Sequence, residues 1–175
     1  MKRGVDGSIN VADYDFKKAV VVVNCASNFD GRKLLNIKEL TKVVHKAGGI
    51  IIIDAAQAMA HSADIIRGVE VDAICFSAHK MYAPSLGVIV WRDDLASKLV
   101  DGFIGGGMVD DVTKDGYTLS ADNKEHRHTR FESGLQAWGE IVGLEAAINW
   151  IENVPKEDWQ IFEKNYTELY DFLKQ

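Results

Sequence analysis

The stretch AVVVVNCASNFDGRKLLNIKELTKVVHKAGGIIIID, residues 19–54, decides the fold class. It opens with the β-branched run 19–25 and closes with four isoleucines and Asp54, and each run is typical of a short strand covered on both faces. Between them, apolar residues recur at helical spacing from Ile37 to Val44, and Gly48-Gly49 ends the pattern. A strand, a helix and a strand joined by tight loops predict a βαβ unit and a parallel sheet.

The rest of the chain extends this α/β pattern. Two further strands are expected at 71–77 and 87–91, then a short amphipathic helix at 92–100 and a long glycine-bearing segment without evident structure at 102–122. Two helices follow, the first from Gly134 to Trp150 and the second from Glu157 to Leu173, and Pro155 separates them. The second helix carries a stripe that we interpret as core or interface packing: Trp159, Phe162, Tyr166, Leu169 and Phe172 or Leu173.

Composition excludes several classes of protein. The 175 residues carry 20 Lys+Arg and 26 Asp+Glu, a formal net charge of −6 without a basic run, so neither nucleic acid nor an anionic membrane surface is an expected partner. The longest aliphatic runs are far shorter than the roughly 20 residues of a membrane-spanning helix. Cys25 and Cys75 lie in or beside apolar runs and are expected to be buried small hydrophobes in a reducing cytoplasm.

Polar residues follow two of the expected strands. Asp54 ends one strand with Gln57 three residues later, and Ser77, His79 and Lys80 end another. Ligands of doubly wound sheets bind beyond the carboxyl ends of the strands, so these side chains are candidates for a site. A carboxylate beside an amine nucleophile suits a cationic heterocycle that carries an aldehyde.

The runs IIIDAAQAMAH, DAICFSAHKMYAP, GGGM and RFESG resemble the class V aminotransferase family of fold-type I pyridoxal-phosphate enzymes, in its cysteine desulfurase and selenocysteine lyase branch. The resemblance covers roughly residues 13–154. It implies a mostly parallel α/β sheet with flanking helices, part of the large domain of PLP-dependent transferases. Residues 1–154 are then a partial PLP-binding large domain, and 155–175 a helix leading toward a small domain that is missing.

The resemblance also implies a role for each matching residue. Lys80 would bind the aldehyde of pyridoxal 5'-phosphate and move the substrate's α-proton, and Asp54 would pair with the pyridinium nitrogen. Gln57 would contact the ring's phenolic oxygen. Ser77 and His79 would reach the phosphate. The other matching positions are Asn28, beside the substrate or the ring, and Arg130 and Glu132, on the dimer-facing side of the site.

Some family features are absent from this sequence. The N-terminal portion that supplies a phosphate-binding Thr and the His stacked on the ring is missing, as is the small domain with the nucleophilic cysteine and the substrate-binding arginine. Neither cysteine of this chain matches that nucleophile. Two local elements also differ, because the loop after the lysine reads APSLG at 83–87 and Leu135 replaces a Thr that reaches a partner subunit's phosphate. Both changes weaken phosphate binding.

Simpler interpretations compete with the functional ones. Asp54 could cap a helix, and His61 could be a structural histidine. A further functional possibility is that the Gly105–Gly107 run cradles a phosphate, but three glycines in a row are its one signal. His126 and His128 lack partners at metal-ligand spacing, so no metal site is expected.

Three hypotheses about function remain. The first is a PLP-dependent enzyme that cleaves the C–S or C–Se bond of cysteine or selenocysteine to give alanine, present as a fragment inactive alone. The second is a catalytically silent domain that acts as a binding or partner subunit. The third, a nucleotide-binding module, lacks the expected G-x-G-x-x-G. The expected partners are an amino acid substrate, a second copy of the chain in a homodimer, and a protein that accepts the sulfur.

Overall fold

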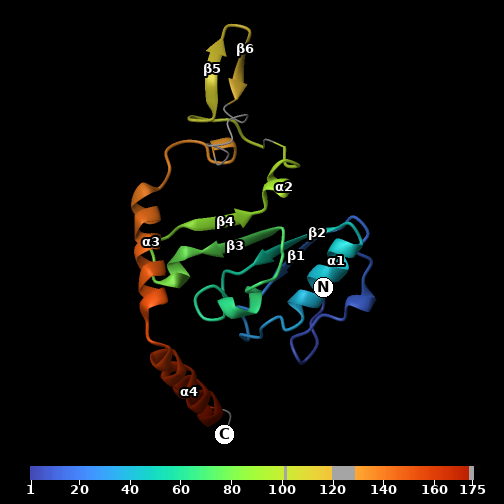
Figure 1. The fold of residues 1–175 in the computed structure, drawn as a ribbon, viewed down its shortest axis with the longest axis vertical. Coiled ribbons are helices and arrows are strands. Elements are labelled where there is room, and N and C mark those ends of the chain that lie inside the picture. The colour runs from blue at the N-terminus through green and yellow to red at the C-terminus, as the bar shows by residue number, and fades with distance from the viewer. Residues whose placement is uncertain (101, 120–128, 174–175) are drawn as a thin grey trace.

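A computed structural model describes residues 1–100, 102–119 and 129–173 (Figure 1). Its six strands form a four-stranded sheet and a separate hairpin, with helices beside the sheet and at the C-terminal end of the chain. The helices and strands are β1 (Val20–Asn24), α1 (Ile37–Lys46), β2 (Ile50–Asp54), β3 (Ala73–Ser77), β4 (Gly87–Trp91), α2 (Asp93–Ala96), β5 (Val109–Thr113), β6 (Gly116–Leu119), α3 (Trp138–Asn153) and α4 (Lys156–Leu173). Short 3₁₀ helices are η1 (Val11–Asp13), η2 (Ala63–Ile66) and η3 (Ala78–Met81).

The larger sheet has the strand order β1-β2-β3-β4. The first two pairings are parallel and the third is antiparallel, so the sheet is mostly parallel, as the sequence predicts. Register places Asn24 beside Asp54 and Asp54 beside Cys75. The carboxyl ends of β1, β2 and β3 therefore share one edge of the sheet.

One face of the sheet is packed against α1. Val21, Val23, Ile51 and Ile53 point to this face and are buried in a core that includes Leu40 of the helix. Removing such side chains from water is the main stabilising term for the sheet, at roughly 1.5–3 kcal/mol each. The core therefore lies between α1 and the first two strands.

The opposite face of β1 is open, which corrects the expectation of a strand covered on both faces. Val20 and Val22 are 63% and 64% exposed, and Ile89 of β4 is 57% exposed on the same face by register. The β-branched composition fits a buried strand, but within the described residues only the α1 side supplies a full apolar layer over β1. The result is an exposed apolar surface, here called the open sheet face and defined by Val20, Val22 and Ile89.

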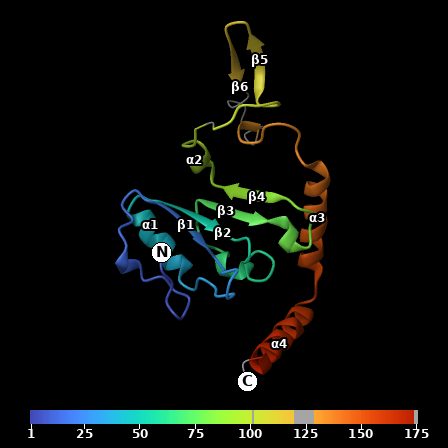
Figure 2. The ribbon, with the colours of Figure 1, turned by 180° about the vertical axis from the view of Figure 1, so that it is seen from behind.

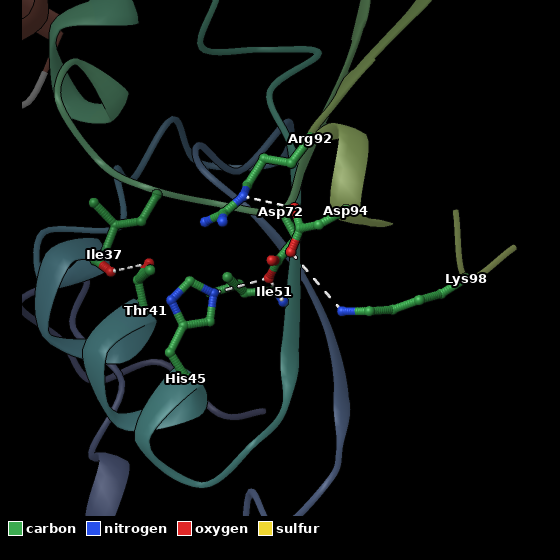
Figure 3. Close-up of polar contacts among 8 residues, drawn as sticks. All are labelled: Ile37, Thr41, His45, Ile51, Asp72, Arg92, Asp94 and Lys98. Carbon is green, nitrogen blue, oxygen red and sulfur yellow. Dashed lines mark hydrogen bonds and ion pairs between the residues drawn. The ribbon is translucent and has the colours of Figure 1, made fainter. Parts of the chain in front are cut away.

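Asp72 joins three elements immediately before β3 (Figure 3). Its Oδ2 atom accepts hydrogen bonds from the backbone N–H of Ile51 at 2.7 Å and from Nε2 of His45 at 2.9 Å. Its own backbone N–H donates to the carbonyl of Ile51, and its carbonyl accepts from Arg92. Asp72 is buried, and its carboxylate joins β2 to α1. The strand that the sequence predicts at 71–77 begins two residues later, at Ala73.

The segment 102–122 contains more structure than the sequence analysis expected. Strands β5 and β6 form an antiparallel hairpin around Lys114 and Asp115, with a register irregularity near its base. The two loop residues are Lys114 and Asp115, not the Asn-Gly or Asp-Gly pair that signals a two-residue hairpin turn in a sequence. Most of the hairpin's side chains are exposed, so hydrophobic alternation does not mark it. The helix expected at 92–100 is also shorter, and covers only Asp93–Ala96.

Helix α3 lies at the end of the sheet where β3 finishes and α4 extends away from the sheet beyond it, while the hairpin projects at the end of the molecule opposite α4 (Figures 1 and 2). The aromatic stripe of α4 is not core: Phe162, Tyr166 and Leu169 are each at least half exposed. Among the described residues, no helix is long and apolar enough to cross a membrane.

Candidate active site at the carboxyl edge of the sheet

Asp54 ends β2 at the edge where the parallel strands finish. Its Oδ1 atom accepts the backbone N–H of Ala56 at 2.9 Å, a local turn bond that begins the connection after the strand. The residue is otherwise exposed, and Asn24 and Cys75 flank it in the sheet. A carboxylate of this kind can pair with a cationic group of a ligand at the sheet edge.

Lys80 lies in η3, the turn that follows β3. Its Nζ atom donates a hydrogen bond to Oε1 of Gln57 at 2.5 Å. Gln57 belongs to the connection after β2, so this bond joins the two segments that follow neighbouring parallel strands. Both side chains are partly buried, and the amine is held near the end of the strand that carries Asp54.

Ser77 and His79 form a second polar pair on the same turn. Ser77 is the last residue of β3, and its Oγ atom lies 2.6 Å from Nδ1 of His79. Hydroxyl and imidazole groups are both able to donate to an anion. The turn therefore places an amine beside two groups that have the chemistry to donate to an anion.

The backbone of η3 is tightly constrained. Ala78 is fully buried, and its N–H donates to the carbonyl of Leu86. The carbonyl of Ala78 accepts from the N–H groups of Tyr82 and Ala83. Tyr82 ends the turn in the left-handed region at φ 64°, ψ 15°, a conformation that costs a non-glycine residue about 1–2 kcal/mol.

Asn28 does not join this group of side chains. It is exposed in the turn after β1, where Oγ of Ser27 accepts the N–H groups of Phe29 and Asp30. In the part of the chain that the structure describes, Asn28 makes no hydrogen bond to Asp54, Gln57 or Lys80. The structure thus brings five of the six sequence candidates to the ends of β2 and β3, and leaves Asn28 on the neighbouring turn.

The two cysteines are poor nucleophiles. Burial raises the pKa of the Cys25 thiol to about 12, an effect that the positive charge of Arg3 opposes. Burial also raises the pKa of the Cys75 thiol, and the negative charge of Asp54 adds to this increase. Cys25 is fully buried, as expected, whereas Cys75 is only partly buried because it faces the less covered side of β3. Burial therefore disfavours the reactive thiolate form of both side chains.

The RFESG and GGGM elements pack against one another. The N–H of Gly134 donates to the carbonyl of Gly106 at 2.7 Å, and a Cβ atom on Gly105 would lie 2.8 Å from Cβ of Ser133. Close approach of two loops therefore explains Gly105 without a phosphate. Arg130 donates to the carbonyls of Ala96 and Leu99, so it fastens this segment to the end of α2.

Aromatic contacts beside the turn were not anticipated from the sequence. The ring of Tyr82 packs against Trp150 of α3 with centroids 5.1 Å apart, and against His61 at 6.3 Å. The ring of His61 stacks on Phe162 of α4 at 6.1 Å. The helical spacing of Trp150 and Phe162 is visible in the sequence, but periodicity does not identify their partners.

Metal binding finds no support in the described ranges, where no group of three or more His, Cys, Asp or Glu residues could hold an ion. His126 and His128 lie outside the described residues.

The structure is a mostly parallel α/β sheet with polar side chains beyond its carboxyl edge, which is where doubly wound domains bind their ligands. The chain belongs to the aminotransferase class-V family, whose model matches residues 8–175. Its fold is the one expected from the sequence, part of the large domain of PLP-dependent transferases.

Relatives within this family are cysteine desulfurases. The chain is 30% identical over 150 residues to a probable cysteine desulfurase of Haemophilus influenzae, a match that covers 85% of this chain and 33% of the relative. It is 31% identical over 165 residues to the cysteine desulfurase of Pectobacterium atrosepticum, and this match covers 91% of this chain and 39% of the relative. The chain therefore spans between a third and two fifths of the length of these relatives.

Solved structures of cysteine desulfurases share the fold of this chain. The apo structure of the cysteine desulfurase from Thermococcus onnurineus NA1 superposes with a TM-score of 0.73 at 31% identity, covering 85% of this chain and 37% of that one. The structure of the cysteine desulfurase CsdA of Escherichia coli superposes with a TM-score of 0.71 at 24% identity, covering 82% of this chain and 35% of that one. At this identity the similarity is one of fold.

Proposed function

We propose that this chain carries the cofactor-binding half-site of a pyridoxal-phosphate-dependent enzyme that cleaves the C–S or C–Se bond of cysteine or selenocysteine. The observation that carries the proposal is the hydrogen bond from Lys80 Nζ to Gln57 Oε1. This bond holds the amine against the connection that follows Asp54, the last residue of β2. The similarity to cysteine desulfurases supports the choice of reaction.

The described residues fit pyridoxal 5'-phosphate by their chemistry. Asp54 offers an exposed carboxylate to a pyridinium nitrogen, and Gln57 offers an amide to the ring's phenolic oxygen. Ser77 and His79 offer donors to a phosphate. Asn28 is kept in the proposal as a residue on the neighbouring turn that faces the substrate or the ring. When bound, the cofactor supplies an electron sink that makes the α-proton of an amino acid acidic.

Lys80 would act on that proton. Its Nζ atom is the basic group at this edge that could remove the proton from the α-carbon of the substrate and return one later. Gln57 would orient the amine, since its Oε1 atom accepts from Nζ. Asp54 would hold the ring in its protonated form by charge pairing.

Sulfur removal requires a nucleophilic thiol that this chain does not supply. As the Cβ–S bond breaks, sulfur passes to a thiolate and the carbon skeleton takes up a proton to become alanine. Cys25 and Cys75 have raised pKa values, so neither thiol is suited to accept sulfur near neutral pH. We therefore propose that the chain is inactive alone, with a second subunit or a sulfur-accepting protein supplying the thiol.

The alternative is a catalytically silent domain that serves as a binding or partner subunit. The raised pKa values of both thiols favour this alternative. This function predicts no release of sulfide or selenide from cysteine or selenocysteine, with or without the cofactor.

The test is a titration of the purified protein with pyridoxal 5'-phosphate. A visible absorption band, followed by borohydride reduction and peptide mapping, should place the adduct on Lys80. Lys80→Ala should abolish the adduct, and Lys114→Ala, at a lysine exposed in the hairpin turn, should leave it unchanged. An adduct scattered over surface lysines and unaffected by Lys80→Ala would contradict the proposal. Turnover of cysteine in the presence of an added thiol, which takes the place of the missing sulfur acceptor, then separates the enzyme from the silent domain.

A further inference from the structure

Tyr82, two residues after Lys80, has a left-handed backbone conformation and a half-exposed side chain whose ring contacts two other aromatic rings. In the described ranges, it and Lys18 are the non-glycine residues with positive φ. Lys18 lies in the loop before β1, whereas Tyr82 closes the turn that carries the amine. Such conformations persist where surrounding contacts hold them.

The contacts that hold Tyr82 come from two other parts of the chain. Its ring meets Trp150 of α3 edge-on, at 5.1 Å and 70°, and meets His61 in the connection after β2, at 6.3 Å and 82°. Edge-to-face geometry is the favoured arrangement of aromatic pairs. The ring is therefore positioned between α3 and the segment that also contains Gln57.

A second contact brings α3 against the same turn. Pro84 packs on Gly143 so closely that a Cβ atom at position 143 would lie 2.5 Å from Cγ of Pro84. Only a glycine allows this approach without displacing the proline. The segment 82–84 therefore contacts α3 at two adjacent points: Tyr82 packs against Trp150, and Pro84 packs against Gly143.

We propose that Tyr82 is a positioning residue for Lys80. The N–H of Tyr82 donates to the carbonyl of Ala78, which closes η3 around Lys80. The clamped ring prevents the turn from relaxing out of the left-handed conformation, so the amine stays directed at Gln57. The role of Lys80 in catalysis rests on the proposed function, but its fixed orientation is a property of this chain by itself.

The experiment reports on Lys80 without cofactor or turnover. Reductive methylation of the intact protein with ¹³C-formaldehyde gives each lysine a dimethylamine resonance, and Lys80→Arg identifies the signal of Lys80. In the wild-type protein this signal should be separated from those of the exposed lysines, because Nζ is held against Gln57. Tyr82→Phe keeps the ring and should keep the separation, whereas Tyr82→Ala should move the signal to the position of the exposed lysines.

Two further variants distinguish positioning from general packing. Tyr82→Gly reaches the left-handed and the ordinary backbone conformations with equal ease and lacks the ring, so nothing holds the turn in one of them and the Lys80 signal should move even if Tyr82→Ala fails to fold. Tyr166→Ala removes an exposed tyrosine of α4 and should leave the Lys80 signal in place. Retention of the wild-type signal in Tyr82→Gly, or a wild-type signal that coincides with exposed lysines, would overturn the proposal.

The result is independent of the outcome with pyridoxal 5'-phosphate. A separated Lys80 signal that depends on Tyr82, together with no cofactor adduct, would support positioning and contradict the proposed function. An adduct on Lys80 in both the wild-type protein and Tyr82→Gly, with an unchanged signal, would support the function and contradict positioning.

Discussion

Lys80 and Gln57 are 23 residues apart in the sequence, yet their side chains are joined by a hydrogen bond of 2.5 Å between Nζ and Oε1. The bond links the connection after β2 to the turn after β3. It therefore ties together the two segments from which the proposed site is built.

Gln57→Ala should loosen this edge of the sheet. Removing the acceptor from a partly buried ammonium group lowers the free energy of unfolding by about 1 kcal/mol and weakens binding of pyridoxal 5'-phosphate. Urea denaturation and a cofactor titration measure the two effects. Gln160→Ala, at an exposed glutamine of α4, is the matched control and should change neither. Equal behaviour of the two variants would show that the bond has no energetic role.

Asp54→Asn should increase the reactivity of Cys75. Burial raises the pKa of this thiol and the charge of Asp54 raises it further, so less thiolate is present at a given pH. Removing the charge lowers the pKa, and alkylation by iodoacetamide should become faster at mildly alkaline pH. The rate is measured by mass spectrometry of the Cys75 peptide. Asp94→Asn, at an exposed carboxylate paired with Arg92, should leave the rate as it is.

Asp72→Ala should destabilise the fold far from the proposed site. The substitution leaves the buried N–H of Ile51 without its side-chain acceptor and removes the partner of His45, at a cost of about 2–3 kcal/mol. Asp72→Asn retains one acceptor oxygen and should cost less. Urea denaturation gives both values, with Asp94→Asn as a surface control expected within about 0.5 kcal/mol of the wild type. Wild-type stability of Asp72→Ala would rule out this role.

The open sheet face should cause the chain to associate with a second copy. Exposed apolar surface favours association, and Val20 and Val22 on β1 and Ile89 on β4 are exposed on the same face of the sheet. Sedimentation velocity should detect dimers or larger species that dissociate on dilution. Val22→Lys should reduce them, whereas Val5→Lys, at an exposed valine near the N-terminus, should not. A monomer at high concentration would contradict this prediction.

The sequence predicts the framework because its signals are local. Helical spacing in α1 and the isoleucine run of β2 mark these elements within a few residues, and parallel pairing then requires Asp54 and Ser77 to finish at one edge. The candidates at that edge could therefore be named before the structure was known.

Other features depend on contacts between distant segments. Asp72 looks like part of a strand, and only the folded chain shows that its carboxylate binds Ile51 and His45. Tyr82 occupies a left-handed position that glycine or asparagine usually fills, so no residue type signals it. The exposure of Val22 follows from what covers the strand, which composition does not reveal.

Strand order in the larger sheet is the same as strand order in the chain, and this has a consequence for the route of folding. Within the described sheet, each strand pairs with the strand that follows it in the chain, so none of these three pairings requires a segment from farther along the sequence. Contacts between segments close in sequence form faster than contacts across long loops. During synthesis, β1, α1 and β2 can associate first, and β3 and β4 can then add in turn as each leaves the ribosome.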